Sequence, residues 1–200
     1  FRPQFFCPKG ERPPACSPPD YEGAPVTPDP AVARVLAPAF AAAAARKAEP
    51  LGVEVTTTVK RAHKDESALG NLFADLMRAA RPKADVALVN GGGLRRDLPP
   101  GPLLYGTLFE ASPFDNTFAS ATITAGELAR VVARNLGGPG GILSMSGVRA
   151  AARCEAGKLV VTLSREDGRP IAEHETLTLV TSDFLATGGD GVLTEVRERE

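Results

Sequence analysis

Short apolar runs and two-residue alternations predict β-strands at about residues 53–59, 85–90, 117–123, 142–148, 159–163 and 176–181. Apolar residues at helical spacing, together with start and stop signals, predict helices at about residues 27–48, 67–81, 105–111 and 124–137. Strands and helices follow one another without strict alternation. The pattern therefore predicts an α+β fold in which helices flank a mixed β-sheet.

Three of the predicted helices carry boundary or face signals. Thr27 is expected to cap the first helix with its hydroxyl, and Pro38 is expected to kink or split that helix. Thr124 and Glu127 have the spacing of a capping box, in which each side chain accepts the other residue's backbone amide. An apolar stripe on the helix at 67–81 predicts contact with the core, and its members are Leu69, Leu72, Phe73, Leu76, Met77 and Ala80.

Composition narrows the class of protein. The 200 residues are 43% hydrophobic, which is typical of a globular chain, and the net charge of −1 gives no electrostatic reason to expect a nucleic acid polymer as partner. No apolar run is long enough to cross a bilayer. The N-terminus lacks the pattern of a signal peptide, and Phe1 in place of Met suggests a processed or truncated product. Residues 1–26 are rich in proline and predict an extended segment.

Cys7 and Cys16 enclose a short stretch rich in Pro and Gly. A disulfide between them would need an oxidising compartment, and two unpaired surface thiols are the alternative. Cys154 is left over and is expected to be a small buried side chain rather than a nucleophile.

Several common catalytic and cofactor motifs are missing from the sequence. A dinucleotide fingerprint starting at Gly91 would need glycine where Arg96 stands, and no Walker pattern occurs. The histidines are His63 and His174, and no cluster of His, Cys and Asp has the spacing of a metal site. The chemistry must therefore be sought in the loops.

Three loops at element ends carry special residues. The first, 90–95, begins with Asn90, has three glycines and ends with Arg95. The second, 112–116, contains Phe114, and the third, 183–193, combines Phe184 with a glycine-rich turn around Asp190. Glycines let backbone approach a ligand closely, an aromatic ring offers a flat face to a base, and a carboxylate accepts from sugar hydroxyls. A core phenylalanine followed by an ordinary turn is the simpler interpretation of each aromatic.

Together with Glu66–Leu72 and Tyr105–Gly106, these loops resemble the C-terminal, substrate-binding domain of the 5'-nucleotidase family, in the same order from about Val53 to Leu193. The resemblance implies a domain arrangement in which residues 1–26 end a metallophosphoesterase domain, 27–50 form an interdomain helix and 51–200 form the nucleotide-binding domain. It also implies two divalent metal ions in that other domain, so that this chain alone is expected to be inactive. The family's periplasmic or extracellular setting favours the Cys7–Cys16 disulfide.

The resemblance assigns roles to individual side chains. Phe114 and Phe184 would sandwich the nucleobase, Asn90 would read its edge and Asp190 would hold the ribose. Arg95 would direct the phosphate end, and Gly93 would let backbone approach the ligand. The family usually has arginine where His63 stands, so either His63 or Arg61 would supply that cation.

Function follows from these roles in more than one way. The main interpretation is the nucleotide-recognising domain of a hydrolase that acts on nucleoside 5'-monophosphates, with a nucleotide or nucleoside as ligand. The same clamp would serve a cyclic-nucleotide phosphodiesterase or a UDP-sugar hydrolase, because stacking accepts any base. A nucleoside-binding module without a hydrolase role is a third possibility.

Overall fold

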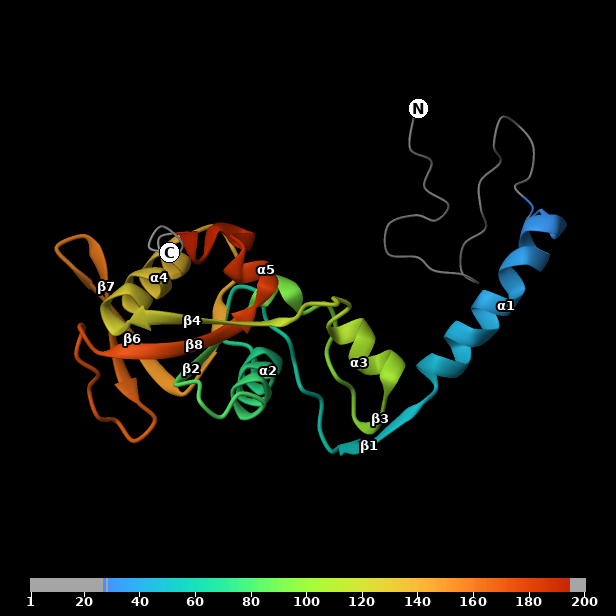
Figure 1. The fold of residues 1–200 in the computed structure, drawn as a ribbon, viewed down its shortest axis with the longest axis horizontal. Helices are drawn as coiled ribbons and strands as arrows, with labels where there is room; N and C mark the ends of the chain where they lie inside the picture. Colours follow the sequence, from blue (N-terminus) through green and yellow to red (C-terminus); the bar gives the residue numbers. More distant parts are fainter. Residues whose placement is uncertain (1–26, 28, 195–200) are drawn as a thin grey trace, which may run out of the picture. The chain divides into compact units, whose positions relative to one another are not determined.

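The computed structural model describes residue 27 and residues 29–194, and the chain divides into two units, residues 1–46 and 47–200 (Figure 1). Cys7 and Cys16 lie outside the described residues, so their pairing stays a prediction.

Helix α1 (Pro30–Lys47) begins later than predicted. The carboxylate of Asp29 accepts the backbone amides of Ala31 at 2.7 Å and Val32 at 3.0 Å, so Asp29 rather than Thr27 caps the helix. Of the two outcomes expected at Pro38, the split is wrong, because α1 continues through Pro38, and the kink stays a prediction.

The second unit is built on a four-stranded sheet in the order β4-β8-β2-β5. Its strands are β2 (Val86–Asn90), β4 (Phe118–Thr124), β5 (Leu143–Ser146) and β8 (Thr176–Ser182). β2 and β8 are parallel, whereas the β4–β8 and β2–β5 pairs are antiparallel, which confirms the predicted mixed sheet.

Helices cover both faces of this sheet (Figure 1). Leu128 and Val131 of α4 (Ala125–Gly137) share a core cluster with Val86 and Leu88 of β2. Ala74 of α2 (Ala68–Ala79) packs in another cluster with Ala87, which lies between those two residues on β2. Because neighbouring strand residues point to opposite faces, α2 and α4 lie on opposite sides of the sheet.

The predicted helix signals in this unit are largely confirmed. Thr124 and Glu127 form the capping box at the start of α4, and Ser67 caps α2 by accepting from the amide of Gly70. Leu76 and Ala80 are the exceptions in the predicted stripe, since both are exposed rather than buried.

Smaller elements complete the unit. β1 (Pro50–Val55) pairs with β3 (Gly101–Leu104), and α3 (Tyr105–Ala111) follows directly. β6 (Val148–Glu155) and β7 (Lys158–Arg165) form a separate two-stranded ribbon. The short elements η1 (Gly91–Gly93), α5 (Asp183–Ala186) and η2 (Gly189–Gly191) lie at the ends of β2 and β8.

Cys154 corrects a prediction. It lies on β6 and is exposed, not buried, because every residue of β6 after Val148 is exposed. No helix in the part of the chain that the structure describes is long and apolar enough to cross a membrane.

Candidate functional site

Phe114 and Phe184 line the same surface cavity, which has a volume of about 230 Å³. It lies where loops from different parts of the chain meet beyond the ends of β2 and β8. The other residues that line it are Asn90, Gly92, Gly93, Arg95, Asn116 and Asp190. The fold thus gathers the predicted aromatic pair, both predicted polar contacts, Gly93 and the predicted cation of the 90–95 loop in one place.

Phe184 is presented by the start of α5. Ser182 caps this single turn by accepting from the amide of Leu185, and the Phe184 side chain stays 42% exposed. A Cβ atom at Gly189 would lie 2.5 Å from the ring, closer than real contacts allow. Glycine at position 189 therefore lets the η2 turn pack directly behind the Phe184 ring.

Phe114 lies in the loop between α3 and β4 and is 45% exposed. The guanidinium carbon of Arg95 lies 5.2 Å from the centre of its ring, within the range of a cation–π contact. The amide of Arg95 donates to the carbonyl of Ala111 at 2.8 Å, which fastens the 90–95 loop to the end of α3. Both exposed rings thus occur at element ends, as expected for side chains that meet a ligand rather than the core.

Asn90 and Asp190 contact each other across the cavity. The side-chain nitrogen of Asn90 donates to Asp190 at 2.8 Å. An ionised carboxylate only accepts hydrogen bonds, so this contact fixes the orientation of the Asn90 amide and turns its carbonyl oxygen away from Asp190. Asp190 itself has φ 54° and ψ 8°, a left-handed conformation that Asp tolerates better than most residues.

His63 does not line this cavity. It lines an adjoining cavity of about 370 Å³, which shares Asn90, Gly92 and Asp190 with the first. The guanidinium of Arg61 donates to the carbonyl of Leu94 at 3.3 Å. Of the two cations considered for the family arginine's position, His63 is the one that lines a cavity bordering the aromatic pair.

The wall of the adjoining cavity is the glycine-rich loop 138–141. Asn135 holds this loop, because its side chain donates to the carbonyl of Gly141 at 2.9 Å and accepts from the amide of Leu143 at 3.0 Å. Lys64 donates to the carbonyl of Gly140 at 3.1 Å from the other side. Hydrogen bonds from Asn135 and Lys64 therefore hold the loop that lines the second cavity.

Two residues near the aromatic pair were not singled out from the sequence. The amide of Asp183 donates to the carbonyl of Thr117 at 2.9 Å, and the hydroxyl of Thr117 donates to the carboxylate of Asp183 at 3.0 Å. The Thr117 hydroxyl holds the pKa of Asp183 below its ordinary value of 3.8. Their positions were the one signal in the sequence that could have indicated them. Thr117 directly precedes β4, and Asp183 directly follows the neighbouring strand β8.

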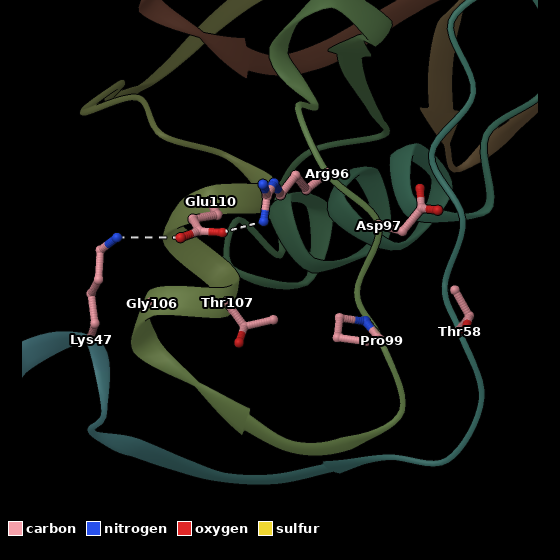
Figure 2. A pocket seen from close by; sticks show the side chains of 8 residues that line it. All are labelled: Lys47, Thr58, Arg96, Asp97, Pro99, Gly106, Thr107 and Glu110. Atoms are coloured by element: carbon pink, nitrogen blue, oxygen red, sulfur yellow. Dashed lines mark hydrogen bonds and ion pairs between the residues drawn. The ribbon is translucent and has the colours of Figure 1, made fainter. Parts of the chain in front are cut away.

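A larger cavity of about 550 Å³ lies elsewhere in the second unit and has a different character (Figure 2). Glu110 of α3 accepts from Lys47 at 3.2 Å and from Arg96 at 2.7 Å, so its central charges are paired with one another. A Cβ atom at Gly106 would lie 2.8 Å from the Cβ of Lys47, so glycine there permits close packing. These contacts fasten Lys47 to α3 and Arg96 to the same helix.

Within residue 27 and residues 29–194, no group of three or more His, Cys, Asp or Glu side chains is placed to hold a metal ion. The side chains that line the smaller cavity offer two aromatic rings, two amides, a carboxylate and a guanidinium.

Comparisons with known proteins show what the chain is similar to. Residues 43–196 match the family model described as "5'-nucleotidase, C-terminal domain". The "Endonuclease YhcR" of Bacillus subtilis is 38% identical over 125 residues, which are 61% of this chain and 10% of that protein. The "Probable 5'-nucleotidase" of Treponema pallidum is 29% identical over 136 residues, or 62% of this chain and 23% of that protein.

A solved structure gives the same result. The 5'-nucleotidase precursor of Thermus thermophilus superposes with a TM-score of 0.68 at 29% identity, covering 87% of this chain and 37% of that one. The chain therefore spans less than a quarter of the length of these two curated relatives.

Proposed function

The chain belongs to the family of the 5'-nucleotidase C-terminal domain, and we propose that it binds the nucleoside part of the substrate of a nucleotide phosphohydrolase. The observation that carries this proposal is the shared cavity of Phe114 and Phe184, two half-exposed rings brought together from distant segments. Exposed aromatic rings bind planar bases by stacking, whatever the identity of the base.

The polar groups of the cavity take complementary roles in this proposal. Asn90 presents its carbonyl oxygen to the edge of the base, because its nitrogen is held by Asp190. Asp190 accepts from the ribose hydroxyls, and Arg95 directs the phosphate end with its fixed guanidinium fork. Gly93 lets backbone approach the ligand, and His63 contributes a second, titratable cation from the adjoining cavity.

Hydrolysis belongs to another part of the protein in this proposal. We assign residues 1–26 to the end of a metallophosphoesterase domain, residues 27–50 to the interdomain segment and residues 51–200 to the nucleotide-binding domain. Two divalent metal ions in that other domain would polarise the phosphate and supply a metal-activated water. We also propose a periplasmic or extracellular location, in line with the family resemblance, and no hydrolysis by this chain alone.

The adjoining cavity favours a second candidate substrate. Its volume of about 370 Å³ leaves room beside the nucleoside site for a larger group, such as the sugar of a UDP-sugar. A panel of nucleoside monophosphates, cyclic nucleotides and nucleotide sugars, assayed on the protein with its metal domain, separates these substrates. Preference for monophosphates supports the main proposal, and preference for nucleotide sugars supports the second.

The direct test is a calorimetric titration of adenosine and of AMP into this chain in the absence of metal, which measures the affinity for each ligand. We expect weak, measurable binding that falls about 5- to 150-fold in Phe184→Ala, the range expected for one stacked base. Phe109→Ala is the matched control, because Phe109 is similarly exposed at 46% but stacks on Tyr105 away from the cavity. Undiminished affinity in Phe184→Ala would contradict the proposal.

A further inference from the structure

The spacing between the Phe114 and Phe184 rings has to be set by something other than core packing. Phe114 and Phe184 are 45% and 42% exposed, so the core encloses neither side chain fully. Phe114 lies on a loop, and Phe184 lies in a helix of a single turn. A direct link between the loop and the single helical turn would help to fix a gap fit for a planar base.

Thr117 and Asp183 provide such a link. The antiparallel pairing of β4 and β8 ends at Phe118 and Ser182. Thr117, just before Phe118, and Asp183, just after Ser182, extend the contact between the two segments. There the amide of Asp183 donates to the Thr117 carbonyl at 2.9 Å, and the Thr117 hydroxyl donates back to the Asp183 carboxylate at 3.0 Å. The two hydrogen bonds close a small ring between the segments that carry the aromatic side chains.

The second oxygen of the Asp183 carboxylate acts on the other aromatic segment. It accepts from the amide of Phe184 at 2.9 Å, while the carbonyl of Asp183 accepts from the amide and hydroxyl of Thr187, both at 2.8 Å. Asp183 thus anchors the turn that presents Phe184, and it also holds Thr117, three residues after Phe114. Gly189 closes the arrangement by packing behind the Phe184 ring.

Resting on the proposed nucleoside site, we infer that Thr117 and Asp183 are positioning residues that fix the gap between Phe114 and Phe184. Neither residue lines the cavity of the aromatic pair. They affect ligand affinity only by positioning the two rings, so they should change the binding of the base and not that of the sugar.

The test compares isosteric and conservative variants of the chain. Thr117→Val removes the hydroxyl at nearly constant shape, and Asp183→Asn puts a donor where one of two acceptor oxygens stood. We expect adenosine affinity to fall about fivefold to tenfold in each, the size of one typical net hydrogen bond. Thr117→Ser keeps the hydroxyl and is expected to bind adenosine like the wild type.

Two readouts separate positioning from a merely structural role. Affinity for ribose 5-phosphate, which has no base, should not change in Thr117→Val, whereas affinity for adenosine should. The double variant should lose less than the product of the two single losses, because both changes act on the same Thr117–Asp183 hydrogen bond. Equal losses for both ligands, or loss of adenosine affinity in Thr117→Ser, would overturn the inference.

Crystal structures of the chain and of Thr117→Val report the ring separation without any ligand. A changed separation supports the inference, and an unchanged separation with unchanged adenosine affinity overturns it. If the wild-type chain fails to bind adenosine, the proposed function fails, and the ring separation then decides the positioning role by itself.

Discussion

Two of the cavities in the second unit differ more in the side chains on their walls than in size. The larger one, of about 550 Å³, is centred on Glu110, whose charge is shared by Lys47 and Arg96. The smaller one, of about 230 Å³, has two exposed rings on its walls. Groups already paired with one another gain little from a ligand, whereas an exposed aromatic face gains a stacking partner. Both cavities contain paired polar groups, so the exposed aromatic faces, and not the volume, distinguish the candidate site.

The sharpest way to break this comparison is to remove both rings. Phe114→Ala together with Phe184→Ala should abolish measurable adenosine binding, because each stacked base contact contributes about 1–3 kcal/mol. Glu110→Gln, in the larger cavity, is the control and should leave the affinity unchanged. Calorimetric titration of both variants checks the expectation. Adenosine binding that survives in the double variant and disappears in Glu110→Gln would place the ligand in the larger cavity and contradict the proposed site.

A smaller effect is expected from the support behind one ring. Gly189→Ala places a Cβ atom 2.5 Å from the ring and from the carbonyl oxygen of Phe184, so that the ring or the turn must shift. We expect adenosine affinity to fall about tenfold, which corresponds to about 1.4 kcal/mol. Gly137→Ala is the matched control, since a Cβ atom there has no neighbour within 4 Å. A fluorescence or calorimetric titration that ranks the two variants equally would contradict the packing role of Gly189.

The larger cavity offers a stability prediction. Glu110→Gln weakens two ion pairs whose side chains are 38% to 56% exposed, so the free energy of unfolding should drop by no more than about 1 kcal/mol. The drop should shrink in high salt, because exposed charges are screened. Urea denaturation at low and high salt measures both. If the loss of unfolding free energy persists in high salt, Glu110 stabilises the fold by packing and not through its ion pairs.

The smallest expected effect concerns pH near the aromatic pair. The hydroxyl of Thr117 and nearby amides hold the pKa of Asp183 below 3.8. A carboxylate with a depressed pKa in the folded state stabilises that state above its unfolded pKa, and this contribution is lost as the pH falls through the folded pKa. NMR titration of the Asp183 carboxyl should therefore show a midpoint below 3.8, moved upward in Thr117→Val. An identical midpoint in both chains would remove the hydroxyl as the cause.

Local sequence patterns predicted much of the fold because they depend on near neighbours. Tyr105–Ala111 is a helix as expected, and the Thr124–Glu127 capping box is present. The motif order also pointed to Phe114 and Phe184, which the fold does bring to one cavity.

Predictions that required knowledge of the third dimension were less successful. Leu76 matched the apolar stripe of α2 but is exposed, because the small residues Gly70 and Ala74 form the buried face and allow the helix to approach the sheet. A Cβ atom at Gly70 would lie only 2.0 Å from the Ser144 hydroxyl oxygen, which shows how close the helix lies. Cys154 was expected to be buried, but it lies on the exposed part of β6, away from the ribbon residues Val148, Val161 and Leu163 that join the core.

The hydrogen bond between Asn90 and Asp190 could not be predicted, since its partners are 100 residues apart. Each side chain had its own expected role toward the ligand, and nothing in their local sequence indicates that they meet. The same holds for Thr117 and Asp183, whose contact depends on the register of β4 against β8. Sequence motifs indicated which residues matter, while the contacts among them came from the fold.

The bond from Asn90 makes the two oxygens of Asp190 unequal, because one already accepts an amide at 2.8 Å. In the proposed site, the other oxygen is left for the vicinal diol of a ribonucleoside. A 2'-deoxyribonucleoside offers one donor fewer, so the chain should bind precursors and breakdown products of RNA more tightly than those of DNA.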